Sequence, residues 1–151
     1  MTDTAPKTGC VFCDAARLAD QQALIVFSGS LAYVILNKYP YNNGHLMVVP
    51  HRHTSTFATL DVSELNELML LTQRSEIVLR QAYSLEGINV GVNLGKPAGA
   101  GIEEHLHIHL VPRWAGDTNF MTVVGETRVL PETLEATAAR LRPLFKDIAG
   151  R

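Results

Sequence analysis

One stretch of the chain decides its local fold: Glu104-His105-Leu106-His107-Ile108-His109-Leu110-Val111-Pro112. Histidines alternate in it with aliphatic residues, and successive side chains of a β-strand point to opposite faces of the sheet. On a strand the histidines form one row and the aliphatic residues the other, whereas a helix would point the middle histidine away from its neighbours. The alternation therefore predicts a strand over His105–Pro112 whose aliphatic row is buried against the core.

The row of imidazoles needs a chemical explanation of its own. Neutral imidazoles offer nucleophiles, proton carriers and metal ligands near pH 7. An exposed strand face that is histidine-rich by chance is the plainest alternative, but three of the six histidines in the chain fall in this strict alternation. A catalytic zinc site with three histidine ligands is a stronger competitor, although such sites usually recruit a ligand from elsewhere in the chain.

The elements on either side of this strand favour an α+β fold. The expected elements are a turn and short helix within Cys10–Asp20, strands over Leu24–Phe27, Leu31–Asn37, His45–Pro50 and Ile88–Leu94, a helix from Asp61 to about Leu85 that Gly87 ends, and a final helix opened by Leu130-Pro131-Glu132. Asp61 and Glu64 resemble a capping box at the start of the long helix. The order of elements predicts a mostly antiparallel sheet with one long helix and a C-terminal helix.

Length and charge narrow the class of protein. A chain of 151 residues suits a single domain over 1–151. The formal net charge of −2 gives no global basic field to attract nucleic acid or an anionic membrane, so a phosphate ligand must meet local donors. The N-terminus lacks an apolar signal core, and the apolar runs are too short to span a bilayer. We therefore expect a cytoplasmic protein that binds neither nucleic acid nor membranes.

Several motifs together resemble the histidine triad superfamily of nucleotide hydrolases and transferases. His-Leu-His-Ile-His-Leu-Val followed by Pro112-Arg113 looks like the signature of that family, and Cys10-Val11-Phe12-Cys13 matches the N-terminal motif of many members. The residues after the triad, Pro112-Arg113-Trp114-Ala115-Gly116-Asp117-Thr118-Asn119-Phe120-Met121, are similar to the branch that degrades diadenosine polyphosphates. The resemblance covers most of the chain, from Cys10 to the last helix. It implies a histidine-triad-like nucleotide-binding catalytic domain, and usually a homodimer in which two sheets join edge to edge.

The resemblance also implies a role for each residue of the site. His107 is the expected nucleophile, which attacks the α-phosphorus and forms a nucleotidyl-histidine, and His109 stabilises the phosphate charge. The other expected substrate contacts are the ribose contact Asn37, the phosphate donor Asn93, the pocket residue His45, and an anion-binding nest of backbone N–H groups over Gly99–Ile102 that includes Gly101. Arg113 and Lys96 could contact phosphates but are equally well explained as ordinary surface cations. Trp114 could stack on a base or pack between subunits.

The cysteine pair predicts a metal site. Cys10 and Cys13 have the spacing of zinc ligands, and a tetrahedral site needs two more. His53 and His105 are the candidates, and the resemblance implies these four residues as ligands of a structural zinc, which takes His105 out of acid–base chemistry. His51 shares a face with His53 on an extended exit from the strand and is a decoy candidate. A reduced pair of small buried residues is the plain alternative, and a redox motif lacks its usual βαβ context.

One position bears on whether water or inorganic phosphate attacks the nucleotidyl-histidine intermediate. Many hydrolases of this family carry glutamine four residues before the first triad histidine, where this chain has Gly101. A glycine leaves room for inorganic phosphate to attack the intermediate, so we expect phosphorolysis of diadenosine tetraphosphate to ADP and ATP. One alternative is hydrolysis of diadenosine polyphosphates. A second is a nucleoside phosphoramidase, but the long tail after the triad argues against it. A third is a nucleotide-binding sensor. A divalent cation could accompany the substrate, but no carboxylate cluster predicts a dedicated catalytic metal site.

Overall fold

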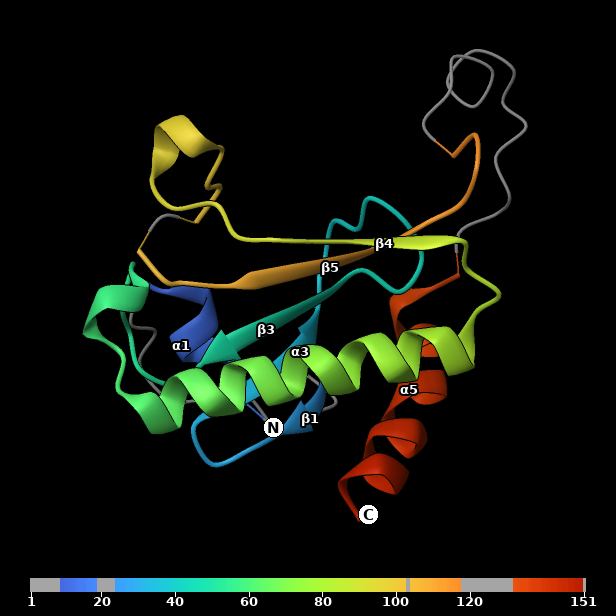
Figure 1. The fold of residues 1–151 in the computed structure, drawn as a ribbon, viewed down its shortest axis with the longest axis horizontal. Coiled ribbons are helices and arrows are strands. Elements are labelled where there is room, and N and C mark those ends of the chain that lie inside the picture. Colours follow the sequence, from blue (N-terminus) through green and yellow to red (C-terminus); the bar gives the residue numbers. More distant parts are fainter. Residues whose placement is uncertain (1–8, 19–23, 103, 118–131, 151) are drawn as a thin grey trace.

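One antiparallel sheet organises the computed structural model, with strand order β1-β2-β3-β5-β4 (Figure 1). The strands are β1 (Ile25–Ser28), β2 (Ala32–Leu36), β3 (Leu46–Pro50), β4 (Gly87–Gly91) and β5 (Ile108–Arg113). Every neighbouring pair is antiparallel, which confirms the predicted α+β class. The structure describes residues 9–18, 24–102, 104–117 and 132–150.

Helices cover the two faces of this sheet unequally. The long helix α3 (Val62–Ala82) packs across β2, β3 and β5, and α5 (Leu134–Ala149) packs against α3 and β1 (Figure 1). The short helix α1 (Val11–Ala15) contributes to a separate apolar cluster on the other face, with Tyr33 and Val49. Two 3-10 turns, η1 (Phe57–Thr59) and η2 (Lys96–Ala98), lie in the loops. Within the described residues, no helix is both long and apolar enough to cross a membrane.

The predicted division of the histidine stretch into two rows is confirmed. Leu106, Ile108 and Leu110 are all buried in the main core cluster that also contains α3 residues. Burial of three aliphatic side chains of this size is worth roughly 1.5–3 kcal/mol each. The aliphatic row therefore anchors the stretch to the α3 side and leaves the histidines on the opposite face, where α1 lies.

The hydrogen-bonded strand is shorter than predicted, because β5 begins at Ile108 and not at His105. Its partner β3 ends at Pro50, and the last pair between the two strands is Val48 with Ile108. The chain before Ile108 instead stays attached through Leu106, whose backbone N–H donates to the Thr54 carbonyl over 2.7 Å. The alternation therefore persists beyond the ladder, because the backbone is still extended and tethered there.

Two helix boundaries differ from the predictions as well. The capping box of Asp61 and Glu64 is confirmed, but α3 ends at Ala82, with Tyr83 already extended as its C-cap. Gly87 therefore does not end the helix; it is the first residue of β4, which stops at Gly91 rather than Leu94. The C-terminal helix begins at Leu134, capped by the Thr133 side chain. The predicted start at 130–131 lies outside the described residues.

Candidate active site and metal cluster

The three histidines of the row lie side by side, and α1 covers part of them. The ring centroids of His107 and His109 are 4.7 Å apart. Phe12 of α1 packs against the row, 4.9 Å from the His107 ring and 5.5 Å from the His105 ring. His105 and His107 are buried, whereas His109 is partly exposed. The face opposite the core is thus a partly covered imidazole surface rather than a solvated strand face.

Backbone geometry fixes the protonation form of His107. Its Nδ1 lies 2.9 Å from the carbonyl oxygen of His105, which can only accept a hydrogen bond. Nδ1 therefore carries the proton in the neutral ring, and Nε2 keeps a free lone pair. This is the form that a nucleophilic imidazole needs, because the attacking nitrogen has no proton to lose.

A chain of hydrogen bonds assigns the protons on His45 and His109. The backbone N–H of Tyr41 donates to His45 Nδ1 over 3.2 Å, so the neutral His45 carries its proton on Nε2. That Nε2 lies 2.9 Å from His109 Nδ1, which accepts. His109 is left with an N–H on Nε2, the correct form to donate to a phosphate oxygen. His45 thus lies against the histidine row, and Asn37 lies beside it with its amide nitrogen 3.4 Å from His45 Nε2.

The environment keeps these imidazoles neutral at pH 7. Burial, together with repulsion from neighbouring histidines, lowers the pKa of His45 and of His109 to about 4. Burial also lowers the pKa of His107 below its ordinary value, and the hydrogen bond to the His105 carbonyl opposes this in part. The row therefore holds lone pairs and neutral donors rather than positive charge.

The glycine loop precedes the histidine stretch in the chain, and two of its N–H groups are arranged differently from the predicted nest. The N–H of Gly99 donates to the Lys96 carbonyl and that of Ala100 donates to the Gly95 carbonyl, so both are already used within the loop. The Asn93 amide donates to the Gly99 carbonyl over 3.3 Å. A Cβ at Gly101 would have no heavy atom within 4 Å, which matches the expectation that this position leaves open space.

Arg113 and Trp114 lie in a structural network in this conformation. The Arg113 guanidinium pairs with Asp117 at 2.7 Å and donates to Asn89 over 2.8 Å, and it holds the pKa of Asp117 well below its usual range. The Trp114 indole packs edge-on against Tyr83 and donates to the Ser84 carbonyl. These partners support the interpretation of Arg113 as an ordinary ion-paired cation.

A second cluster lies at the other end of the row. The ligand atoms of Cys10, Cys13, His53 and His105 all lie within 4.8 Å of one another. His105 Nε2 donates to the Pro50 carbonyl over 2.8 Å, so its Nδ1 lone pair faces the Cys10 sulfur at 3.4 Å. Two thiolates and two imidazole nitrogens are the donor set of a tetrahedral zinc site, and the carbonyl behind His105 is the usual second partner of a histidine ligand. The four predicted ligands therefore come together and fit zinc.

The neighbouring His51 does not join this cluster. Its Nε2 lies 3.0 Å from the Gly29 carbonyl, and its ring contacts Tyr33. The Cys13 sulfur instead lies 3.3 Å from His53 Nδ1. The sequence pattern places both histidines on one face of the extended segment after β3, so it could not tell which of them joins the cluster. The tertiary contacts of the two side chains distinguish them.

His105 connects the cluster to His107. Its side chain lies in the cluster, while its own backbone carbonyl orients the His107 ring. A metal held by His105 would therefore steady the peptide unit that sets the His107 tautomer. The geometry of the cluster and the orientation of the His107 ring are therefore linked through one residue.

Two contributors to the site were not identified from the sequence. Phe12, between the cysteines, forms a wall against His105 and His107. Tyr41 supplies the backbone N–H that sets the His45 proton. The apolar residue within the cysteine motif was a usable signal for Phe12, whereas nothing in the side chain of Tyr41 indicates a contact made by its backbone.

Comparison with known proteins places the chain in a family. The HIT domain model matches residues 19–116, and the chain therefore belongs to the histidine triad family. A Mycobacterium tuberculosis protein named AP-4-A phosphorylase is 47% identical over 126 residues, which are 83% of this chain and 65% of that protein. The chain thus spans just under two thirds of that relative's length. A Dictyostelium discoideum protein named bis(5'-adenosyl)-triphosphatase is 31% identical over 84% of this chain and 89% of its own length.

Solved structures agree on the fold. A histidine triad nucleotide-binding protein from Sulfolobus tokodaii superposes with a TM-score of 0.73 at 26% identity, covering 92% of this chain and 93% of that one. A Zn-bound histidine triad family protein from Mycobacterium smegmatis gives a TM-score of 0.71 at 23% identity, covering 94% and 96% of the two chains. The likeness extends over nearly the whole of all three chains.

Proposed function

We propose that this protein is a nucleotidyl transferase that cleaves diadenosine tetraphosphate by phosphorolysis, giving ADP and ATP. The observation that carries the proposal is the His107 ring, whose Nδ1–H is held by the His105 carbonyl so that Nε2 is free to attack. The names of the two curated relatives, a phosphorylase and a triphosphatase of diadenosine nucleotides, support the substrate class.

The reaction proceeds in two displacements at one phosphorus. The His107 Nε2 lone pair forms a bond to the α-phosphorus, the bond from that phosphorus to its bridging oxygen breaks, and ATP leaves with the electron pair. An oxygen of inorganic phosphate then attacks the same phosphorus, the N–P bond breaks, and ADP leaves while His107 regains its lone pair. Splitting the transfer in this way replaces one difficult displacement by two easier ones.

The neighbouring residues lower the barrier by supporting charge on the phosphate. The His109 Nε2–H, fixed by the relay from Tyr41 through His45, donates to a nonbridging oxygen. Asn93 and Asn37 hold the substrate on either side, by its phosphate and its ribose. Contacts within the protein set these donors before the substrate arrives: the His45 side chain orients His109, and backbone groups orient Asn37 and Asn93. Little reorganisation is therefore needed in the transition state.

Zinc in the cluster of Cys10, Cys13, His53 and His105 is part of the proposal. The ion would supply a fixed tetrahedral crosslink between α1, the loop after β3 and the stretch before β5. His105 would hold the ion through Nδ1 and keep its carbonyl aligned on His107 Nδ1. The metal acts on structure here, and the chemistry belongs to the histidines.

Gly101 favours phosphate over water as the second acceptor. A Cβ at this exposed position would meet nothing within 4 Å, so no side chain at Gly101 restricts the size of the acceptor. The hydrolytic relative from Dictyostelium keeps hydrolysis as the second candidate, with water completing the same cycle.

Product analysis distinguishes phosphorolysis from hydrolysis. The purified protein is incubated with diadenosine tetraphosphate, with and without radiolabelled phosphate, and the nucleotides are separated. Phosphorolysis gives ATP and labelled ADP and needs phosphate. Two ADP without label, or ATP and AMP, would show hydrolysis, and no turnover under any of these conditions would contradict the substrate class.

A further inference from the structure

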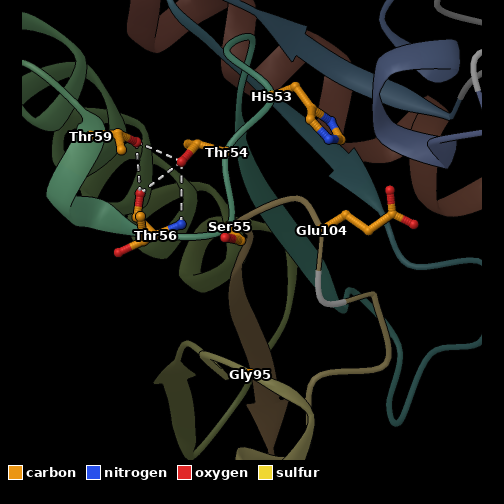
Figure 2. Close-up of a pocket in the computed structure, with 7 residues that line it drawn as sticks. All are labelled: His53, Thr54, Ser55, Thr56, Thr59, Gly95 and Glu104. Atoms are coloured by element: carbon orange, nitrogen blue, oxygen red, sulfur yellow. Dashed lines mark hydrogen bonds between the residues drawn. The ribbon is translucent and has the colours of Figure 1, made fainter.

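A pocket of about 630 Å³ lies beside the metal cluster, shares His53 with it, and is lined by several hydroxyl side chains that the reaction described above does not use. Its lining residues are His53, Thr54, Ser55, Thr56, Thr59, Gly95 and Glu104. Figure 2 shows His53 and Glu104 on one side, the threonines on the other and Ser55 between them. The pocket thus joins the loop after β3 to the stretch that enters the histidine row.

The chemistry of this lining restricts the ligand. It includes a carboxylate and several hydroxyls but no lysine or arginine, so a phosphate group would lie unfavourably beside Glu104. It also lacks a phenylalanine, tyrosine or tryptophan, and it therefore has no platform on which a base could stack. A vicinal diol fits what remains, because its two O–H groups can donate to a carboxylate and exchange hydrogen bonds with hydroxyl side chains.

The lining is arranged in advance for such a ligand. The Thr54 and Thr59 hydroxyls are 2.6 Å apart, and Thr54 Oγ1 accepts the Thr56 backbone N–H. Glu104 is exposed, and its carboxylate has no hydrogen-bond or ion-pair partner among the described residues. The hydroxyls are therefore ordered by one another while the charged acceptor opposite them is free to take donors.

The pocket lies next to the path of a polyphosphate. Gly95 lines it, and the η2 turn that follows, with the exposed Lys96, leads directly to Gly99 and the predicted phosphate contacts. On the other side the His53 ring is 5.2 Å from the His105 ring. His107 lies two residues further along the extended chain, roughly 7 Å away. A chain of several phosphates that starts at His107 can therefore reach the pocket.

We propose that this pocket binds the ribose of the second nucleoside of a dinucleoside polyphosphate, with Glu104 accepting from its 2′ and 3′ hydroxyls. The inference rests on the proposed function, since it describes the leaving half of the same substrate. It assigns to Glu104 the preference for substrates with two nucleosides over those with one. A shorter phosphate chain would bring the second ribose less well into the pocket.

Steady-state kinetics with two substrates test the inference. Diadenosine tetraphosphate carries the second ribose and adenosine tetraphosphate does not, while both offer the same α-phosphorus to His107. Glu104→Ala should lower kcat/KM for the dinucleotide by about tenfold, because a hydrogen-bonded charge is lost, and should change the value for adenosine tetraphosphate by less than about twofold. Ser55→Leu, which fills the pocket, should show the same selectivity. Glu135→Gln, an exposed carboxylate on α5, is the control for a change of charge.

The outcomes separate the two proposals. If the wild-type protein turns over both substrates and the Glu104 and Ser55 variants affect both equally or neither, the pocket assignment is wrong while the proposed function stands. Zinc analysis of each variant shows whether a uniform loss comes through the adjacent cluster. If the wild-type protein turns over neither substrate, the proposed function is wrong and the pocket assignment falls with it.

Discussion

At the scale of single residues, the site depends on where each imidazole keeps its proton. Three different carbonyl or N–H groups of the backbone, from His105, Pro50 and Tyr41, set the tautomers of His107, His105 and His45. Neighbouring and chemically identical side chains are thereby suited to the different tasks proposed for them: nucleophile, metal ligand and donor relay. The difference between them lies in the backbone that each ring faces and not in the residue type.

His107 is the residue whose replacement should abolish the chemistry. His107→Asn removes the attacking nitrogen, and we expect kcat/KM for diadenosine tetraphosphate to fall by at least about a thousandfold. Wild-type protein denatured in alkali during turnover should carry a nucleotidyl adduct, stable in base and labile in acid, that intact-mass spectrometry at alkaline pH detects, and the variant should carry none. A variant that is folded, as shown by circular dichroism, and still forms the adduct would contradict this assignment.

The hydrogen-bonded pair of His45 and His109 should make the fold sensitive to acid. Both have a folded-state pKa of about 4, below the ordinary value of 6.5 expected in the unfolded chain. Between these values the unfolded state binds more protons, so stability is fully present above pH 6.5 and is lost as the pH falls toward 4. Urea unfolding should therefore give a lower free energy at pH 5 than at pH 7.

A variant comparison assigns this acid sensitivity. His109→Asn removes one of the two groups and should flatten the difference between pH 5 and pH 7, whereas His51→Asn removes an exposed histidine outside the pair and is the matched control. Equal flattening in both variants would show that the sensitivity arises elsewhere.

At the scale of elements, three segments meet at the cysteine–histidine cluster. The Cys10 sulfur lies 3.4 Å from the His105 ring and the Cys13 sulfur lies 3.3 Å from the His53 ring, so these pairs connect the start of α1 to the stretch before β5 and to the loop after β3. A metal there would tie the covering helix to the histidine row, and its loss would loosen the peptide that orients His107.

His51 and His53 offer a matched test of that crosslink. Both are exposed and only two positions apart, but only His53 belongs to the cluster. His53→Ala should lower bound zinc from one equivalent to well below it and should lower the melting temperature, while His51→Ala should keep both. Elemental analysis and thermal unfolding give the two readouts. A metal-free wild-type protein with full stability would contradict the structural zinc.

Local patterns predicted most of the elements, and long-range contacts explain where they failed. Alternation predicted the two faces of the histidine stretch, and the Asp61–Glu64 spacing predicted the start of α3, because both are set within a few residues. The end of α3 and the late start of β5 depend on partners distant in sequence, such as Tyr83 with Glu132 and Leu106 with Thr54. The same holds for the site: resemblance implied its ligands, but the relay from Tyr41 and the pocket at Glu104 arise only when separate segments meet.

At the scale of the whole molecule, one edge of the sheet remains open. Strand β4 lies at the end of the strand order and pairs only with β5 among the described residues (Figure 1). Val90 in this strand is 54% exposed and Leu94 just beyond it is 46% exposed, while α3 exposes Met69 at 65%. Free backbone groups beside exposed apolar side chains form a template for another strand. The expected homodimer, in which two β4 edges pair, would supply hydrogen-bond partners for the free backbone groups and cover the exposed apolar side chains.

Placing a charge on this edge should therefore weaken the dimer. Val90→Lys puts a lysine where a second β4 would pair, a substitution that natural edge strands use to prevent association. Sedimentation equilibrium should give a dimer for the wild-type protein at micromolar concentration, and at least about a tenfold higher dissociation constant for Val90→Lys, since an unpaired charge would be buried. Val11→Lys is the matched control, because Val11 is 57% exposed and lies on α1, away from β4. A wild-type monomer at all concentrations, or a Val90→Lys dimer as tight as the control, would show that β4 is a solvent-facing edge in the working protein.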